Sequence, residues 1–400
     1  MGRGNVVLPI MSVVVIAILA LLLGQEPALT YIFFIAGSVL IGWLLNKYNN
    51  RPKVCLTLML FLVVYLTVFI GFRDFGIGTD TNVYIDNYWE LGQSVNGIKD
   101  FFGYDYISKA YLLLSVIGHL FSDDHQTMLL LTALTINLTT FLALYIVNYR
   151  QLEINWIIYI VLWQFLFMNS TMNEMRQDCA QGFALLSMAL FIKKKWIWFL
   201  ICIFISFQFH STVIALLPIV GCYFLDRHFG TKQRNIYTVV GLIALVVIVT
   251  SIFQFGNWLI SSGWLSDHFD LYTNTSTFES TNLFGVSYIT ISLLFLFVCL
   301  SIRKKKLISS SLNYYLLTIY GISFILRLAA FSLVYLSRLS HYYTYITYFA
   351  LAYLMTQYAK KIPISVQVMI YIVVLYTWFT TTILGNSGET YPYQSSILGI

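Results

Sequence analysis

Residues 54–71 read VCLTLMLFLVVYLTVFIG, a stretch without a single charged side chain that decides the fold class. A helix of about 20 apolar residues is long enough to cross the hydrocarbon core of a bilayer. Comparable runs recur from Val7 to Leu384 with short polar interruptions. The 400 residues are 59% apolar and 10% charged, whereas an ordinary soluble domain carries about 25% charged residues. We therefore expect an all-α, polytopic integral membrane protein in which residues 1–400 form a single transmembrane domain.

The positions of lysine and arginine predict the topology, because basic residues collect on the cytoplasmic side of a membrane. With the N-terminus inside, 17 of the 23 basic residues lie in cytoplasmic segments. A stretch between Lys195 and Asp226 is too long for one helix and short for two, which predicts a pair of short helices meeting near His210. The eleven expected full spans are residues 6–23 (an uncleaved first span), 28–46, 54–71, 126–148, 154–170, 171–192, 235–255, 285–302, 309–333, 342–359 and 363–384.

Three segments are predicted to face outward: the loops 72–125 and 256–284 and the C-terminal tail 385–400. The excess of basic residues on the cytoplasmic side requires the segment from Ile107 to Phe121 to lie on the outer surface. If this segment crosses the membrane instead, the orientation of every span before it is reversed. Aromatic residues among carboxylates in the first loop favour interfacial helices that lie on lipid headgroups, and they could also grip sugars. The five cysteines lie inside apolar stretches without CxxC spacing, so we expect packing residues and no disulfide or zinc site.

Six basic residues fall outside the predicted cytoplasmic segments: Arg73, Lys99, Lys109, Arg176, Arg327 and Arg338. Arg176 and Arg327 fall inside predicted spans, roughly 8 Å below their outer ends at 1.5 Å per helical residue. A charge there is costly unless it is paired or faces an aqueous cavity. The alternatives are snorkelling to the headgroups and, for Arg176, an ion pair with a neighbouring carboxylate. A small-and-polar stripe on the same predicted helix indicates a cavity or a tight helix contact; its members are Asn173, Gln177, Ala180, Ala184 and Ser187.

Two further clusters stand out at predicted outer ends. The glycine-containing stretch of residues 71–84 follows a span directly, and its backbone N–H groups together with Arg73 suit an anionic oxygen, although a helix cap at Thr79 or Asp80 explains it equally well. The second cluster surrounds a tight turn expected between two late spans, where arginine and histidine accompany the tyrosines usual at an interface. Its members are Tyr335, Arg338, His341, Tyr342 and Tyr345.

These motifs together resemble the EpsG family of exopolysaccharide polymerases, relatives of the Wzy polymerases. The resemblance runs from about Thr57 to Tyr393 and rests on the order of short motifs and on their placement relative to the spans. The motifs are Arg73-x4-Gly78-Thr79-Asp80-Thr81-x2-Tyr84, Arg176-Gln177-x2-Ala180, Phe209-His210-Ser211, Arg338-x3-Tyr342 and the closing Tyr391-Pro392-Tyr393.

The resemblance implies glycosyl transfer between two undecaprenyl-pyrophosphate-linked oligosaccharides on the outer face of the bacterial cytoplasmic (inner) membrane, which yields O-antigen, capsule or exopolysaccharide. Arginine suits the leaving pyrophosphate, and a carboxylate or imidazole suits the acceptor hydroxyl. The expected catalytic residues are Asp80, His210, Arg176 and Arg338. The expected substrate-binding residues are Arg73, Thr79, Tyr84, Gln177, Arg327, His341 (the reserve for the proton) and Tyr342.

We expect neither a cofactor nor an obligatory metal ion, although Asp74, Asp80 and Asp86 are hard oxygen ligands close in sequence. Expected partners are the lipid-linked oligosaccharide, the bilayer, and a chain-length regulator and flippase of the same pathway, with no nucleic acid. A flippase or other transporter of lipid-linked oligosaccharides and an O-antigen ligase-like transferase are the alternatives, because each needs cations for the same pyrophosphate.

Overall fold

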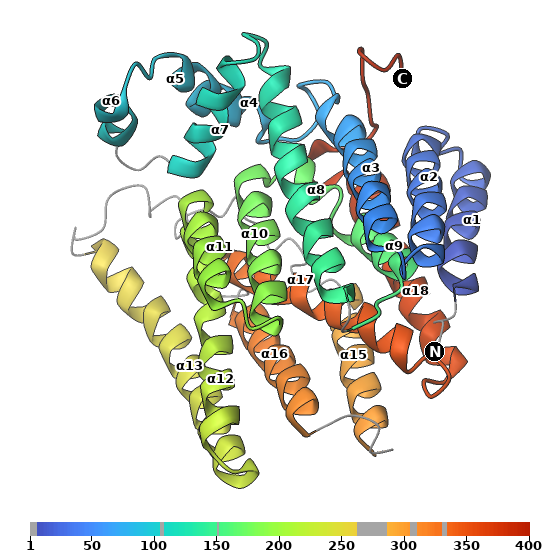
Figure 1. Cartoon of the computed structure of the whole chain (residues 1–400), viewed down its shortest axis with the longest axis vertical. Helices are drawn as coiled ribbons and strands as arrows, with labels where there is room; N and C mark the ends of the chain where they lie inside the picture. The colour runs from blue at the N-terminus through green and yellow to red at the C-terminus, as the bar shows by residue number, and fades with distance from the viewer. Residues whose placement is uncertain (1–5, 105–107, 150–151, 262–285, 305–309, 330–333) are drawn as a thin grey trace. The chain divides into compact units, whose positions relative to one another are not determined.

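The structure is a computed structural model that describes residues 6–104, 108–149, 152–261, 286–304, 310–329 and 334–400 (Figure 1). Within these ranges all regular secondary structure is helical, which confirms the all-α prediction. The chain divides into two compact units. The first contains residues Met1–Val213 and Ala352–Ile400, and the second contains Ile214–Leu351.

The first unit holds most of the long helices and a group of short ones. Long helices are α1 (Val7–Leu22), α2 (Ala28–Lys47), α3 (Pro52–Gly71), α8 (Gln126–Asn148), α10 (Met175–Ile192), α11 (Trp196–Phe209) and α18 (Ile364–Trp378), which continues as a π-helical turn, Phe379–Leu384. Shorter helices are α4 (Thr81–Tyr84), α5 (Glu90–Gln93), α6 (Ile98–Gly103), α7 (Lys109–His119) and α9 (Trp156–Leu166).

The second unit is built from α12 (Leu217–His228), α13 (Thr231–Ser261), α15 (Val286–Lys304), α16 (Ser310–Ala329) and most of α17 (Val334–Gln357). Helix α13 reaches Ser261, so the predicted loop 256–284 begins as helix, and its residues from 262 onward lie outside the described ranges. Helix α17 begins at Val334, eight residues earlier than the predicted span 342–359. The tight turn expected around Arg338 and His341 is therefore wrong, because both residues lie within a helix.

Four helices of the described ranges are long and apolar enough to cross a membrane: Ala28–Lys47, Pro52–Gly71, Gln126–Asn148 and Ile364–Leu384. Five further apolar helices are shorter, among them Val7–Leu22 and Trp196–Phe209. These helices support an integral membrane protein, while eleven full crossings stay a prediction. The five cysteines are free and buried, as expected of packing residues.

The helical break at His210 is confirmed. Helix α11 ends at Phe209, a 3-10 turn covers Ser211–Leu216, and α12 starts at Leu217 with a proline in its first turn. Proline suits a first turn because that position needs no intrahelical N–H donor. The 14 residues of α11 extend about 21 Å at 1.5 Å per residue, less than the hydrocarbon thickness of about 30 Å.

Helix α10 packs tightly against its neighbours along the small-and-polar stripe. Ala180, Ala184 and Ser187 are buried, and the Ser206 hydroxyl of α11 donates a 2.7 Å hydrogen bond to the Ala180 carbonyl. This half of the stripe is a helix contact. Asn173 is not part of it, because α10 begins only at Met175.

Helix α7 has 11 residues and extends about 16 Å, about half of the hydrocarbon thickness of a bilayer. It lies with α4, α5 and α6 at the end of the first unit that also holds the C-terminus (Figure 1). Helix α9, in the predicted span 154–170, is equally short. The outer-surface location of residues 107–121 therefore stays a prediction.

Single cysteines introduced on either side of α7 test this arrangement. Gln93 and Asp123 are both exposed, and we expect both variants to react with a membrane-impermeant thiol reagent added outside the cell. Cysteines at Lys53 and Lys360, which are exposed at predicted cytoplasmic ends, should react only after permeabilisation. Labelling at Gln93 together with protection at Asp123 would show instead that α7 crosses.

Candidate functional site

Arg73 is a completely buried arginine just after α3, with 1% of its surface exposed. Its guanidinium donates to three backbone carbonyls: Nη1 to Ile70 at 2.7 Å, Nη2 to Met172 at 3.0 Å and Nε to Ile77 at 3.3 Å. Burial lowers the pKa of Arg73 to about 10, so the group remains charged at neutral pH. Arg73 therefore ties two chain segments together. Its predicted contact with substrate finds no support in this geometry, because the guanidinium is buried and each of its three nitrogens already donates to a backbone carbonyl.

The loop after Arg73 turns sharply at Gly78, whose φ of 92° lies in the left-handed region that favours glycine. A Cβ at this position would overlap the carbonyl oxygen of Met172. The close approach of the loop to the segment before α10 thus requires glycine here.

The backbone N–H groups of this loop are bonded within the chain. The partners, each at 3.0 Å, are the Glu389 carbonyl for Gly78, the Gly388 carbonyl for Thr79 and the Asn173 side-chain oxygen for Asp80. The Thr79 hydroxyl also donates to Asn173, at 2.8 Å. A phosphate cradle made from these N–H groups is therefore excluded in this conformation. Asp80 precedes α4 without a side-chain cap bond, so side-chain capping does not explain the loop either.

The C-terminal tail folds back onto this loop. The Tyr393 ring stacks on Phe69 with centroids 4.1 Å apart, and its hydroxyl donates to the Phe69 carbonyl. The Asp74 carboxylate accepts from the Ser396 N–H at 2.8 Å and from the Ser396 hydroxyl at 3.0 Å. Asp74 thus holds the tail. Among the described residues no group of three or more His, Cys, Asp or Glu is arranged for a metal ion.

A segment without α-helix, residues 167–174, connects α9 to α10 at this same end, and its middle is a single 3-10 turn, Ser170–Met172. Asn169 accepts a 3.1 Å hydrogen bond from the Trp378 indole and donates to the Thr390 hydroxyl at 3.0 Å. Because this segment is irregular, α10 begins at Met175 and Arg176 occupies its first turn. Helix α10 thus begins four residues later than the predicted span 171–192, and Arg176 lies at its start and not about 8 Å along it, since the predicted spans 154–170 and 171–192 left no room for this segment.

Arg176 lies against two tyrosines of the first loop. Its guanidinium carbon is 5.5 Å from the ring centroid of Tyr84 and 5.2 Å from that of Tyr88, and Nη1 donates to the Tyr88 hydroxyl. Burial raises the pKa of Tyr84 to about 12, against the opposing positive charge of Arg176, while Asp80 and Glu174 raise it further. Tyr84 is therefore a neutral phenol between an arginine and two carboxylates.

Arg176 also borders an open cavity of about 280 Å³ at the N-terminus of α7 and the C-terminus of α11. The cavity brings together two of the predicted catalytic residues, Arg176 and His210. It is lined by Ser108, Lys109, Arg176, Phe207, Gln208, Phe209, His210 and Ser211.

Lys109 adds a second cation to this cavity, which the sequence analysis did not select. Its ammonium group donates to the carbonyls of Phe101, at 3.2 Å, and Tyr104, which leaves one of its three N–H donors. The preceding Ser108 donates to the carbonyls of Gln208 and Phe209 at 2.8 and 2.9 Å and so fastens the start of α7 to the end of α11. The sequence could have pointed to Lys109 as a site residue, because it is one of the six basic residues outside the predicted cytoplasmic segments.

His210 is oriented by Thr212. The Thr212 N–H points at Nδ1 from 3.4 Å, and the Thr212 hydroxyl lies 2.6 Å from the same nitrogen. A backbone N–H can only donate, so Nδ1 accepts and a neutral imidazole carries its proton on Nε2. In this tautomer the second ring nitrogen is a hydrogen-bond donor.

The remaining predicted residues lie elsewhere. Gln177 is buried in α10 with 3% exposure. The others belong to the second unit: Arg327 lies in the last turn of α16, and on α17 Arg338 and His341 are half-buried while Tyr342 is buried. Arg338, Tyr342 and Tyr345 follow the i, i+4, i+7 spacing of one helix face. The catalytic or binding roles expected of these residues stay predictions.

The cavity is therefore lined by an arginine, a lysine and a histidine. Such donors suit phosphate oxygens, and charge-assisted hydrogen bonds are roughly twice as strong as neutral ones. The aromatic rings of Phe207 and Phe209 give the same cavity an apolar side.

The sequence model of the EpsG family matches residues 56–395 of the chain. Neither a curated protein nor a solved structure gives a significant match.

Substitution of Gly78 by alanine tests the packing of the loop that Arg73 anchors. We expect Gly78→Ala to destabilise the protein by about 2 kcal/mol or more, because the methyl group meets a backbone carbonyl in a left-handed conformation. Gly76→Ala is the control, since nothing lies within 4 Å of a Cβ there. The measurement is the melting temperature of detergent-purified protein. Equal melting temperatures for the two variants would contradict the close approach.

Proposed function

The chain belongs to the EpsG family, and we propose that it polymerises lipid-linked oligosaccharide repeat units into a surface polysaccharide. The observation that carries this proposal is the cavity in which Arg176, Lys109 and His210 converge on one site. The reaction takes place on the outer face of the bacterial cytoplasmic membrane, where the predicted topology puts this end of the helices.

The proposed reaction is a glycosyl transfer between two substrates that carry undecaprenyl pyrophosphate. The bond between the sugar C1 and the pyrophosphate oxygen of the growing chain breaks. A new bond forms between that C1 and a hydroxyl oxygen of the incoming repeat unit, and the hydroxyl gives up its proton. Undecaprenyl pyrophosphate is the leaving group, and negative charge grows on its oxygen as the bond breaks.

Arg176 and Lys109 stabilise that growing charge. Arg176 presents a planar fork of N–H donors, and its contacts with the rings of Tyr84 and Tyr88 and with the Tyr88 hydroxyl hold the guanidinium in place. The carbonyl contacts of Lys109 fix its ammonium group. Donors that are oriented before the reaction stabilise a transition state without a cost of reorganisation.

His210 acts on the leaving-group side of the reaction. With its proton on Nε2 it donates a hydrogen bond to the pyrophosphate, which differs from the proton acceptor that we expected from the sequence. The acceptor hydroxyl then needs a carboxylate. Asp80 fills this role best, because its negative charge acts on Tyr84, which in turn lies against Arg176.

Deletion of the gene separates a polymerase from a flippase. We expect surface glycan from the deletion strain to run on a gel as a single repeat unit on its anchor, because synthesis, export and attachment of one unit continue. Complementation with the intact gene should restore the ladder. Absence of every repeat unit would identify a transport defect and reject the polymerase.

The variant Arg176→Lys tests whether the reaction needs the paired N–H donors of the guanidinium. Lysine keeps the charge but not the paired N–H groups, so we expect polymerisation to fall about 10²-fold at a normal protein level, and Arg176→Ala to be worse. The control is Arg51→Lys, which alters an exposed arginine at the start of α3. The readouts are polymer ladder length and membrane protein level. A full-length ladder from Arg176→Lys would remove Arg176 from the site.

A further inference from the structure

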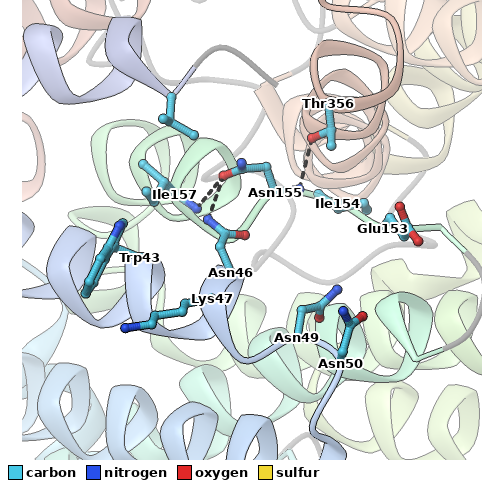
Figure 2. Close-up of a pocket in the computed structure, with 11 residues that line it drawn as sticks. Trp43, Asn46, Lys47, Asn49, Asn50, Glu153, Ile154, Asn155, Ile157 and Thr356 are labelled. Atoms are coloured by element: carbon cyan, nitrogen blue, oxygen red, sulfur yellow. Dashed lines mark hydrogen bonds between the residues drawn. The ribbon is translucent and has the colours of Figure 1, made fainter. Parts of the chain in front are cut away.

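A second and larger cavity, of about 480 Å³, lies in the first unit where the end of α2 meets the start of α9; Figure 2 shows the residues that line it. Helix α9 begins at this cavity and ends at residues 167–174, beside the Arg176 site, so the two cavities lie at opposite ends of that helix. The predicted topology puts this end on the cytoplasmic side. The proposed glycosyl transfer makes no use of this cavity.

One wall of the cavity is held rigid by two asparagines. Asn155 caps α9 by accepting from the Ile157 N–H at 3.0 Å, and its own N–H donates to the Thr356 hydroxyl at 2.9 Å. Asn46 donates to the Asn155 side-chain oxygen at 3.0 Å and accepts from the Trp156 N–H at 3.0 Å. These groups join the ends of α2, α9 and α17 and have few donors left for a ligand.

Four polar side chains of the lining do not take part in joining these helix ends: Lys47, Asn49, Asn50 and Glu153. None of their side chains makes a hydrogen bond or an ion pair within the described part of the chain. Figure 2 shows Lys47 with Trp43 on one side of the cavity and Glu153 on the other, with Asn49 and Asn50 between them. The cavity thus presents a positive and a negative group on opposite sides, separated by amides.

The lysine side of the cavity continues the lipid-facing surface of α2. Phe33, Leu40 and Trp43 are 74%, 62% and 49% exposed and recur at helical spacing, as expected of side chains that face acyl chains. Lys47 follows one turn later, with its ammonium nitrogen 5.2 Å from the Trp43 ring centroid. A tryptophan and a lysine at a helix end are typical of the headgroup level of a membrane. A ligand entering from this side comes from the bilayer.

The glutamate side carries backbone strain. Glu153 has a φ of 40°, and its carbonyl and that of Leu152 accept from the Gln357 side chain at 3.0 and 3.1 Å. Glycine suits this backbone better than any residue with a Cβ. Strained residues of this kind cluster at functional sites, which points to a use for the Glu153 carboxylate.

We propose that this cavity binds the headgroup of a zwitterionic aminophospholipid from the cytoplasmic leaflet. Lys47 contacts the lipid phosphate, Glu153 accepts hydrogen bonds from the primary ammonium, and Asn49 and Asn50, which lie between these two side chains, donate to further oxygens of the phosphate diester. A volume of about 480 Å³ lies within the usual range for small-molecule sites. An anionic headgroup without an amine would leave Glu153 without its ligand.

The test measures lipid binding to the full-length protein, purified in detergent and stripped of lipid, by native mass spectrometry. The probes are phosphatidylethanolamine, phosphatidylglycerol and phosphatidylcholine with identical acyl chains. We expect phosphatidylethanolamine to bind about tenfold more tightly than the other two, because phosphatidylglycerol lacks an amine and phosphatidylcholine lacks N–H donors. Equal binding of the three lipids, or preference for phosphatidylglycerol, would overturn the proposal.

Paired variants assign the contacts. Glu153→Gln and Glu153→Gly should both abolish the preference for phosphatidylethanolamine, while Glu90→Gln, an exposed glutamate on α5, should keep it. Lys47→Gln should weaken binding of every phospholipid, and Lys53→Gln should not. Glu153→Gly also removes the backbone strain at this position, so the melting temperature of this variant should equal or exceed that of the parent. Loss of lipid preference at an unchanged melting temperature would show that the fold is intact and that only the lipid contact is lost.

A soluble probe decides the source of the ligand. Glycerophosphoethanolamine, which has the headgroup without acyl chains, should compete only weakly. Tight binding of this probe would assign the cavity to a water-soluble metabolite and would reject the membrane lipid. The assays need no polymerisation, so their outcome is independent of the proposed reaction.

Discussion

The buried guanidinium of Arg73 is the interaction on which the functional end of the first unit depends. A buried charge is tolerated only when its donors are satisfied, and here the carbonyls of Ile70, Ile77 and Met172 satisfy them. Those carbonyls belong to α3, to the loop after it and to the segment before α10. One side chain therefore fixes three pieces of backbone, and the start of α10, where Arg176 lies, follows from their positions.

Irregular backbone that is buried must also satisfy its own polar groups, because an unpaired buried N–H or carbonyl group costs free energy. The C-terminal tail does this for the loop after α3, through the carbonyls of Gly388 and Glu389, and Asn173 does it from the segment before α10. The tail is thus part of the scaffold. Arg176, Lys109 and His210 are left at the edge of this network, beside a cavity, which explains why they suit a ligand better than Arg73 does.

The two cavities divide the first unit by chemistry. One lies where α7 meets α11 and offers cationic donors that suit a pyrophosphate. The other, at the opposite end of α9, has separated charges and amides beside a lipid-facing tryptophan. Under the proposed function both substrates come from the bilayer, so the first cavity binds the reacting groups and the second holds the protein in contact with lipids.

The sequence by itself determined the all-α membrane architecture, the break at His210 and the burial of the cysteines, because apolar length, charge placement and helical spacing are local properties. It also carried the motifs of the EpsG family. Only the tertiary structure decided what surrounds each motif residue. Arg73 and Arg176 look alike in sequence, yet one is enclosed by carbonyls and the other borders a cavity, because contacts between residues about a hundred positions apart set their surroundings. For the same reason Lys109 joined the site, since Ser108 holds the start of α7 against α11.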